Sequence, residues 1–287
     1  MVIGIAMETT SLDKTNPDLE KIEIDLILRA IYQRYGYDFR NYSKTHLKRR
    51  ILKLMDANQF ENLSRLQHEI LHNETFLAQL LDAFSVNTTE MFRNPEFYLL
   101  FRKNLVAKLN ELDFLRIWIA GSSSGEEAYS LAITLLEEEL YEKCQIYATD
   151  FNANILKKAK EAIYSIDDIK SYVSNYTLSG GKAEFSDYYT ARYGSVIMNP
   201  ELKKKILFAE HNLVTDSVFG EMDLIVCRNV LIYFNRKLQN RVINLFYDSL
   251  RPHGFLCLGS RETLQFTDFK NKFNQLDKDQ RIFEKVN

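Results

Sequence analysis

The stretch WIAGSSSGEEAYSLA, residues Trp118–Ala132, has the pattern of a buried strand, a glycine-rich turn and the start of a helix. Such a turn usually presents backbone N–H groups at a helix N-terminus, where they bind phosphate. Here Glu126 and Glu127 occupy the first helical turn, and their charges would repel a phosphate. A P-loop is excluded because no Gly-Lys-Ser/Thr ends the turn and no lysine lies nearby.

A dinucleotide fits the layout better, but its pyrophosphate would lie on the same helix N-terminus, beside the two carboxylates. A ligand with a positive charge and hydroxyl groups but no phosphate removes this conflict. S-adenosylmethionine, which carries a sulfonium, an ammonium and a ribose, is such a ligand. The stretch therefore favours a site for this cofactor.

Short apolar runs alternate with helical segments after residue 95, and this alternation is typical of βαβ units with a parallel sheet covered on both faces. The expected strands are Leu115–Ala120, Gln145–Ala148, Ile206–Ala209, Leu224–Val226 and Phe255–Leu258. A last run, Arg281–Val286, is expected to complete the sheet as an edge strand.

Two parts of the chain depart from this alternation. Before Phe84, apolar residues recur at three- and four-residue spacing, which predicts helices only. We therefore expect a helical domain over residues 18–86 and an α/β domain over residues 87–287. The segment from about 176 to 205 is rich in Tyr, Ser and Gly, and we expect a small antiparallel insert there, with strands Tyr188–Arg192 and Ser195–Met198.

Composition limits the class of protein. The 287 residues suggest one or two domains, and a net charge of −2 predicts no nucleic-acid coat. Three cysteines without CxxC spacing are expected to be reduced. The N-terminus has no basic region before its short apolar patch, and no run approaches the roughly 20 apolar residues of a membrane span. We expect a cytoplasmic protein without direct membrane insertion, and a monomer.

Polar side chains follow successive strands of the expected sheet. Asp150 ends one strand, where a carboxylate can accept both ribose hydroxyls, and Asn212 and Leu213 follow another, where they could face an adenine. Arg228 and Asn229 close the next strand, at the carboxyl edge where open α/β sheets bind ligands. Each alone has an ordinary explanation, since an Asp at a strand end is often a turn former or helix cap. Together they favour a cofactor site.

Four motifs now resemble one family. They are NTTEMFR (Asn87–Arg93), GSSSGEE (Gly121–Glu127), ATD (Ala148–Asp150) and CRNVLIYF (Cys227–Phe234). In this order they are similar to the motifs of the chemotaxis-receptor glutamate methyltransferases, the CheR family, and the likeness runs from about Lys21 to the end. The resemblance implies a Rossmann-like class I S-adenosylmethionine-dependent methyltransferase fold. It also implies O-methylation of glutamate side chains on a signalling protein, with S-adenosylhomocysteine as the second product.

The resemblance also implies roles for particular residues. The positions that match the family's cofactor contacts are Asn87, Thr89, Arg93, Glu127, Asp150, Asn212, Leu213, Arg228 and Asn229. Arg93 and Tyr233 match the pair beside the reacting carboxylate. Ser122, Ser124 and Ala128 stand where the family usually has Cys, Thr and Pro; these swaps leave the charged groups in place.

Two other functions stay open at this point. A non-catalytic signalling module could bind S-adenosylmethionine or S-adenosylhomocysteine and report it through the helical domain. Methylation of nucleic acid or of an amide nitrogen is disfavoured, because CRNV stands where nitrogen-directed enzymes have Asn/Asp-Pro-Pro-Tyr.

The segment Tyr42–Met55 predicts an amphipathic helix with a basic face of His46, Arg49, Arg50 and Lys53. A solvated helix side is the ordinary interpretation of such a face. Since substrate helices of this family carry several glutamates, we expect the face to dock the cytoplasmic helical region of a chemoreceptor or a similar signalling protein. Nucleic acid is disfavoured by the near-neutral charge and the lack of interleaved aromatics.

The sequence HEILH (His68–His72) matches the HExxH pattern of zinc proteases. A zinc site needs a third ligand, and no downstream histidine motif supplies one. We therefore expect no metal.

Overall fold

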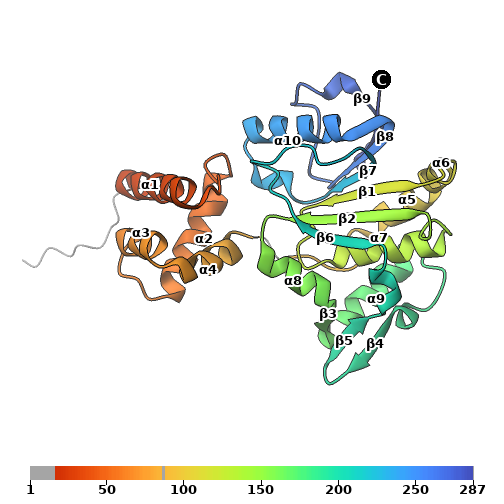
Figure 1. Cartoon of the computed structure of the whole chain (residues 1–287), viewed down its shortest axis with the longest axis horizontal. Coiled ribbons are helices and arrows are strands. Elements are labelled where there is room, and N and C mark those ends of the chain that lie inside the picture. Colours follow the sequence, from red (N-terminus) through yellow and green to blue (C-terminus); the bar gives the residue numbers. More distant parts are fainter. Residues whose placement is uncertain (1–16, 86–87, 287) are drawn as a thin grey trace, which may run out of the picture.

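The computed structural model describes residues 17–85 and 88–286 (Figure 1). Four helices form the N-terminal unit: α1 (Pro17–Tyr35), α2 (Lys44–Ala57), α3 (Leu63–His72) and α4 (Glu74–Phe84). The side chains of Asn62 and Asn73 cap α3 and α4 by accepting backbone N–H groups. Ile31, Leu66 and Leu80 meet in a core of their own. The predicted all-helical unit is confirmed.

The second unit contains a seven-stranded sheet in the order β6-β2-β1-β7-β8-β10-β9. Its strands are β1 (Leu115–Ala120), β2 (Cys144–Asp150), β6 (Ile206–Glu210), β7 (Met222–Cys227), β8 (Leu250–Leu258), β9 (Phe273–Asp277) and β10 (Ile282–Lys285). The strands β6, β2, β1, β7 and β8 are parallel to one another, as predicted. The prediction that the last strand forms the edge is wrong, because β10 lies between β8 and β9 and pairs antiparallel with both. The strand β9, with the sequence FNQLD, was not predicted, because Phe273 is its one buried residue and the strand therefore has no apolar run.

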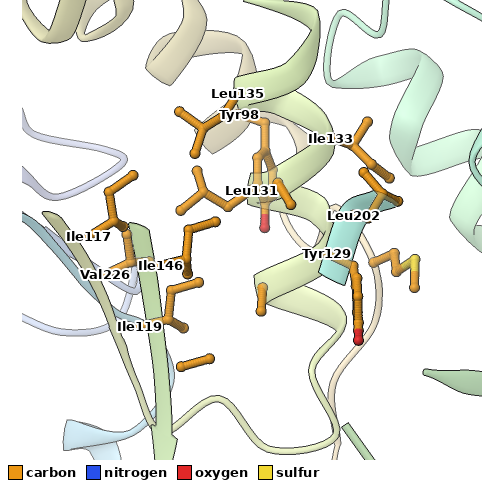
Figure 2. Close-up of a cluster of buried hydrophobic side chains, with 14 of the residues drawn as sticks. Tyr98, Ile117, Ile119, Tyr129, Leu131, Ile133, Leu135, Ile146, Leu202 and Val226 are labelled. Carbon is orange, nitrogen blue, oxygen red and sulfur yellow. The ribbon is translucent and has the colours of Figure 1, made fainter. Parts of the chain in front are cut away.

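Helices cover both faces of this sheet (Figure 1). They are α5 (Pro95–Asn104), α6 (Val106–Asn110), α7 (Glu126–Glu137), α8 (Ala153–Glu161), α9 (Ile169–Leu178) and α10 (Arg236–Ser249). Alternate residues of β1 supply the two cores: Ile117 and Ile119 face Leu131 of α7 (Figure 2), whereas Trp118 packs edge-on against Phe246 of α10. Each fully buried aliphatic side chain here contributes about 1.5–3 kcal/mol. Burial on both faces explains the continuous apolar runs of the sequence.

A second, three-stranded sheet has the order β3-β5-β4 and is antiparallel. Its strands are β3 (Ile163–Ser165), β4 (Tyr189–Arg192) and β5 (Ser195–Met198). The range expected for the insert, about 176–205, therefore omits the first strand of this sheet, β3. The first residue of that range, Tyr176, belongs to helix α9. β3 begins two positions after the end of α8. Its three residues are too few to show the alternation of apolar and polar side chains that predicts a strand. Short 3-10 helices occupy Ile166–Asp168, Phe185–Tyr188, Pro200–Lys203, Leu231–Tyr233 and Lys270–Lys272.

Two sets of hydrogen bonds hold the helical unit against the carboxyl edge of the large sheet. At the first, the backbone N–H of Ser43 donates to the carbonyl of Tyr233 at 2.7 Å, and Tyr42 and Phe234 form an antiparallel bridge. At the second, the side-chain amide of Asn152 donates to Asp82 Oδ1 and to Ser85 Oγ, at 2.8 and 2.9 Å. The helical unit therefore forms one wall of the space above the strand ends. None of the helices in the described ranges has both the length and the apolarity of a membrane span.

Candidate active site

A cleft lies between the helical unit and the carboxyl ends of β1, β2, β6 and β7. The sheet side contributes Gly121, Ser122, Asp150, Asn212, Leu213 and Asn229, among others, and the helical side contributes Tyr42, His46, Leu47, Arg50, Phe84 and Ser85. Thr89, Arg93 and Tyr233 line the same cleft. The structure thus brings together the residues predicted to bind the cofactor and the substrate carboxylate, so far as they fall within its described range. Asn87 lies outside that range.

The turn after β1 requires its glycines. Gly121 has φ +79°, and a Cβ there would lie 2.6 Å from Cγ2 of Val230. Gly125 has φ +94° and caps α7, and a Cβ there would meet Ala159 at 3.0 Å. Both positions combine a left-handed backbone with a close neighbour, so only glycine fits. The turn can therefore pass closely under a ligand in the cleft.

Asp150 ends β2 on the floor of the cleft. Its carboxylate accepts the backbone N–H groups of Ser123 and Asn152, each at 3.1 Å. Burial raises the pKa of Asp150 to about 6, although these hydrogen bonds oppose the shift. The carboxylate is thus fixed in place, and it keeps lone pairs for hydroxyl groups of a ligand.

The two glutamates of the turn have different surroundings. Glu127 lines the cleft and accepts a hydrogen bond from Nη1 of Arg228 at 2.7 Å, so its charge is balanced. Glu126 is buried in the core, where Ser124 Oγ contacts both of its oxygens, and burial raises its pKa to about 7. Only one of the two carboxylates that disfavour phosphate therefore faces the ligand space.

Arg93 and Tyr233 line the cleft from segments far apart in the sequence. Arg93 donates from Nη1 to the carbonyl of Thr88 at 2.9 Å. Tyr233 ends a 3-10 helix, and the His46 ring meets its ring edge-on with centroids 5.2 Å apart. Arg228 is buried under this region and donates to the carbonyl of Arg93 at 2.8 Å. This geometry gives Arg228 a supporting part beneath the cleft, in addition to its place in the lining.

Comparison with known proteins identifies the family. The family model described as CheR methyltransferase, SAM binding domain, matches residues 87–282, and the CheR methyltransferase all-alpha domain matches residues 22–85. The chain belongs to the CheR methyltransferase family. It is an S-adenosylmethionine-dependent methyltransferase of the chemotaxis type, as the resemblance implied.

Curated relatives agree along most of their length. The Pseudomonas putida KT2440 protein named Cher3 is 47% identical over 264 residues, covering 92% of this chain and 97% of the relative. A chemotaxis protein methyltransferase of Listeria innocua is 32% identical and covers 86% of this chain and 92% of its own. Chemotaxis protein methyltransferase 1 of Vibrio cholerae is also 32% identical, covering 82% and 86%.

The cleft of this CheR family member fits S-adenosylmethionine. Within the described part of the chain, the hydroxyls of Ser122 and Ser123 and the Nδ1 atom of His211 are buried without a hydrogen-bond partner, and all three residues line the cleft. Buried polar atoms normally have partners, so a polar ligand is expected to supply them. Asp150 offers an acceptor for ribose hydroxyls, and Glu127, whose Oε1 atom accepts from Arg228, offers Oε2 as an acceptor for an ammonium group. Sequence reasoning did not single out these serines or His211, although three consecutive serines after Gly121 were a usable signal.

Asn212, Leu213 and Asn229 shape the remaining walls. Asn212 Oδ1 accepts the backbone N–H of Val214 at 3.0 Å, and Leu213 is buried beside it. Asn229 has φ +61°, a left-handed conformation that turns the chain sharply after β7. These residues fix the shape of the cleft through the backbone as well as through their side chains.

The structure divides the basic set on α2. Arg50 is half-buried and donates to the carbonyls of Ala83 and Ser85, at 2.6 and 2.7 Å. His46 and Arg50 line the cleft, whereas Arg49 and Lys53 are exposed. The set predicted to be a docking face therefore consists of two exposed cations, Arg49 and Lys53, and two residues that line the cleft, His46 and Arg50, of which Arg50 also binds the end of α4. The fixed carbonyl contacts of Arg50 could not be read from helical spacing alone.

His68 and His72 lie exposed on α3 with their rings 4.5 Å apart. Among the residues that the structure describes, no group of three or more His, Cys, Asp and Glu side chains is arranged to hold a metal ion.

Proposed function

We propose that this methyltransferase esterifies glutamate side chains on the cytoplasmic helical region of a chemoreceptor or a similar signalling protein. The observation that carries the proposal is that Arg93 and Tyr233 line the same cleft as Asp150, together with His46 and Arg50 of the helical unit. Two exposed cations of α2, Arg49 and Lys53, belong to that unit. A carboxylate-bearing helix is the partner that such a charge arrangement favours.

The reaction depends on the alignment of the carboxylate oxygen with the methyl group and needs no general base. A glutamate carboxylate is ionised at neutral pH, because its ordinary pKa is about 4.3. When bound, S-adenosylmethionine supplies a methyl group on a sulfonium and leaves as the neutral thioether. One carboxylate oxygen donates its electron pair to form the O–CH₃ bond as the C–S bond breaks, and no proton moves. The work of the protein is to align that oxygen and to exclude water.

Arg93 and Tyr233 are suited to this alignment. Arg93 can bind a carboxylate with a planar pair of N–H groups, a geometry that lysine lacks. If it gripped both oxygens it would lower their nucleophilicity, so we infer that it contacts the non-attacking oxygen. The Tyr233 hydroxyl then orients the attacking one. The proposed cofactor residues are Asn87, Thr89, Arg93, Glu127, Asp150, Asn212, Leu213, Arg228 and Asn229, so Arg93 would lie between cofactor and substrate.

The decisive experiment is transfer of a labelled methyl group to receptor cytoplasmic fragments, followed by release of methanol with base. Base-labile label on the fragment is the expected result, because only an ester hydrolyses readily. A fragment whose methylated glutamates are replaced by alanine serves as the control and should stay unlabelled. Tight binding of S-adenosylmethionine without any transfer would instead support a non-catalytic signalling module.

Reversing the charge of Arg49 and Lys53 together, R49E/K53E, should raise the KM for an acidic receptor fragment about 10-fold at low salt. The change replaces attraction by repulsion at the proposed docking face. Salt should weaken fragment binding to the wild type, because the Debye length shortens to about 8 Å at 0.15 M. S-adenosylmethionine binding should not change.

The matched control is K170E/K278E, which makes the same charge change at two exposed lysines on α9 and in the turn before β10. Equal effects of the two double variants, or fragment binding that ignores salt, would contradict docking on α2.

A further inference from the structure

Glu262 is a buried carboxylate outside the cleft that binds the loop on which the site is built. It follows β8 and is 3% exposed. Its Oε1 atom accepts the backbone N–H groups of Val230 and Leu231, at 2.9 and 2.7 Å. Its Oε2 atom accepts those of Asn229 and Gly259, at 3.1 and 2.5 Å. All four donors are backbone amides, and within the described residues no cation pairs with this carboxylate.

Three of these amides, those of Asn229, Val230 and Leu231, begin the loop that leads from β7 to Tyr233. Asn229 is left-handed there, and the first N–H groups of the following 3-10 helix, Leu231–Tyr233, have no partner within that helix. Glu262, from a distant part of the chain, supplies an acceptor for the first of them, that of Leu231, and for those of Asn229 and Val230 just before the helix. It therefore acts as a cap that the loop cannot make from its own residues.

Further contacts hold this loop in place. Gln239 Nε2 donates to the carbonyls of Leu231 and Phe234, at 2.9 and 3.1 Å. The side chain of Val230 fills the space that a Cβ at Gly121 would need, so the loop rests directly on the glycine turn. A shift of Val230 would disturb both sides of the cofactor cleft at once.

We propose that Glu262 is a positioning residue that fixes Asn229 against the cofactor and Tyr233 against the substrate carboxylate. The proposal rests on the site roles proposed for those two residues. Only an ionised carboxylate suits the place, because both oxygens must accept. A glutamine would turn an NH₂ group toward N–H donors and leave two buried amides without acceptors, a change that costs about 1–3 kcal/mol for each.

The test compares Glu262→Gln with Glu137→Gln. Glu137 is also a buried glutamate with several donors, namely the hydroxyls of Tyr176 and Tyr188, the N–H of Lys182 and the guanidinium of Arg102, but it ties α7 to the insert, away from the cleft. Both variants should lose stability. Only Glu262→Gln should raise the Kd for S-adenosylhomocysteine about 10-fold by calorimetry and speed amide hydrogen exchange at Asn229, Val230 and Leu231 at least 10-fold.

Unchanged affinity and exchange in a folded Glu262→Gln protein would overturn the proposal. If that variant does not fold, exchange in the wild type decides: the three amides should be as protected as those of β7, and rapid exchange would overturn the proposal equally. Both readouts are independent of methyl transfer. A wild type that binds S-adenosylhomocysteine but methylates nothing would refute the proposed function, and with it the role of Tyr233, but would leave standing the role of Glu262 in fixing Asn229 against the cofactor.

Discussion

Replacing Asp150 by asparagine should weaken S-adenosylmethionine binding about 100-fold at pH 7.5, a loss of about 2.7 kcal/mol. The carboxylate is held by the N–H groups of Ser123 and Asn152, so its position does not depend on the ligand. Hydrogen bonds to a charged acceptor contribute about 1.5–3 kcal/mol each, and an amide offers one acceptor where the carboxylate offers two. Calorimetry with Asp279→Asn, in an exposed turn, as the control measures the difference.

The pH dependence of binding tests the same group. Because burial raises the pKa of Asp150 to about 6, the free protein protonates this carboxylate as the pH falls through 6. Affinity for the cofactor should therefore be constant from pH 7 to 8 and decline below 6, whereas the affinity of Asp150→Asn should not follow this titration. Wild-type affinity in the variant would exclude a direct contact with the ligand.

Asp150 should also lower the stability of the protein when no cofactor is bound. Its pKa is higher in the folded chain than in the unfolded chain, so the unfolded state binds fewer protons between about pH 4 and 6. The contribution of this group to the free energy of unfolding therefore falls as the pH rises through that window. Above pH 7, Asp150→Asn should be at least as resistant to heat as the wild type when no cofactor is present, which thermal unfolding can check. A binding group that opposes folding is typical of a functional site.

The sequence predicted the parts of the fold that repeat a local pattern. The strands β1, β2, β6, β7 and β8 are apolar runs of ordinary length, and the turn at Gly121 carries its own glycine signal. The β3 strand and the outer strand β9 were missed because each has few buried positions; β3 is stabilised by pairing with β5, about 30 residues away, and β9 by pairing with β10 at the edge of the large sheet. Period and propensity carry no information about such pairings.

The site shows the same limit. Asp150 and Asn212 could be found because they follow recognisable strands. The capping of the loop by Glu262, the burial of Arg228 beneath Arg93 and the fixed contacts of Arg50 all join residues that are far apart along the chain. Nothing local in the sequence distinguishes Arg50 from its exposed neighbour Arg49. The charged residues of a site are thus easier to predict from the sequence than the protein groups that already form hydrogen bonds with them.

Removing the guanidinium of Arg93, in Arg93→Ala, should lower the rate of methyl transfer on the order of 100- to 1,000-fold, because the substrate carboxylate loses its alignment. Within the described residues, the side chain of Arg93 makes one protein hydrogen bond, to the carbonyl of Thr88, so its other N–H groups are available to a ligand. Tyr233→Phe should lower the rate about 10- to 100-fold. Arg93→Lys should recover only part of the loss, because an ammonium cannot reproduce the planar pair of donors.

Single-turnover transfer with cofactor bound beforehand separates these roles from binding. Arg29→Ala on α1 and Tyr193→Phe, at a residue that is 94% exposed, are the matched controls and should transfer at the wild-type rate. If both site variants also transferred at that rate, neither residue would touch the reacting carboxylate. If affinity for S-adenosylhomocysteine fell as steeply as the rate, Arg93 would serve the cofactor alone. A rate loss with affinity held within a few-fold of the wild type is the result expected if both side chains act on the acceptor carboxylate, Arg93 on its non-attacking oxygen and Tyr233 on its attacking oxygen, because cofactor binding does not need that carboxylate.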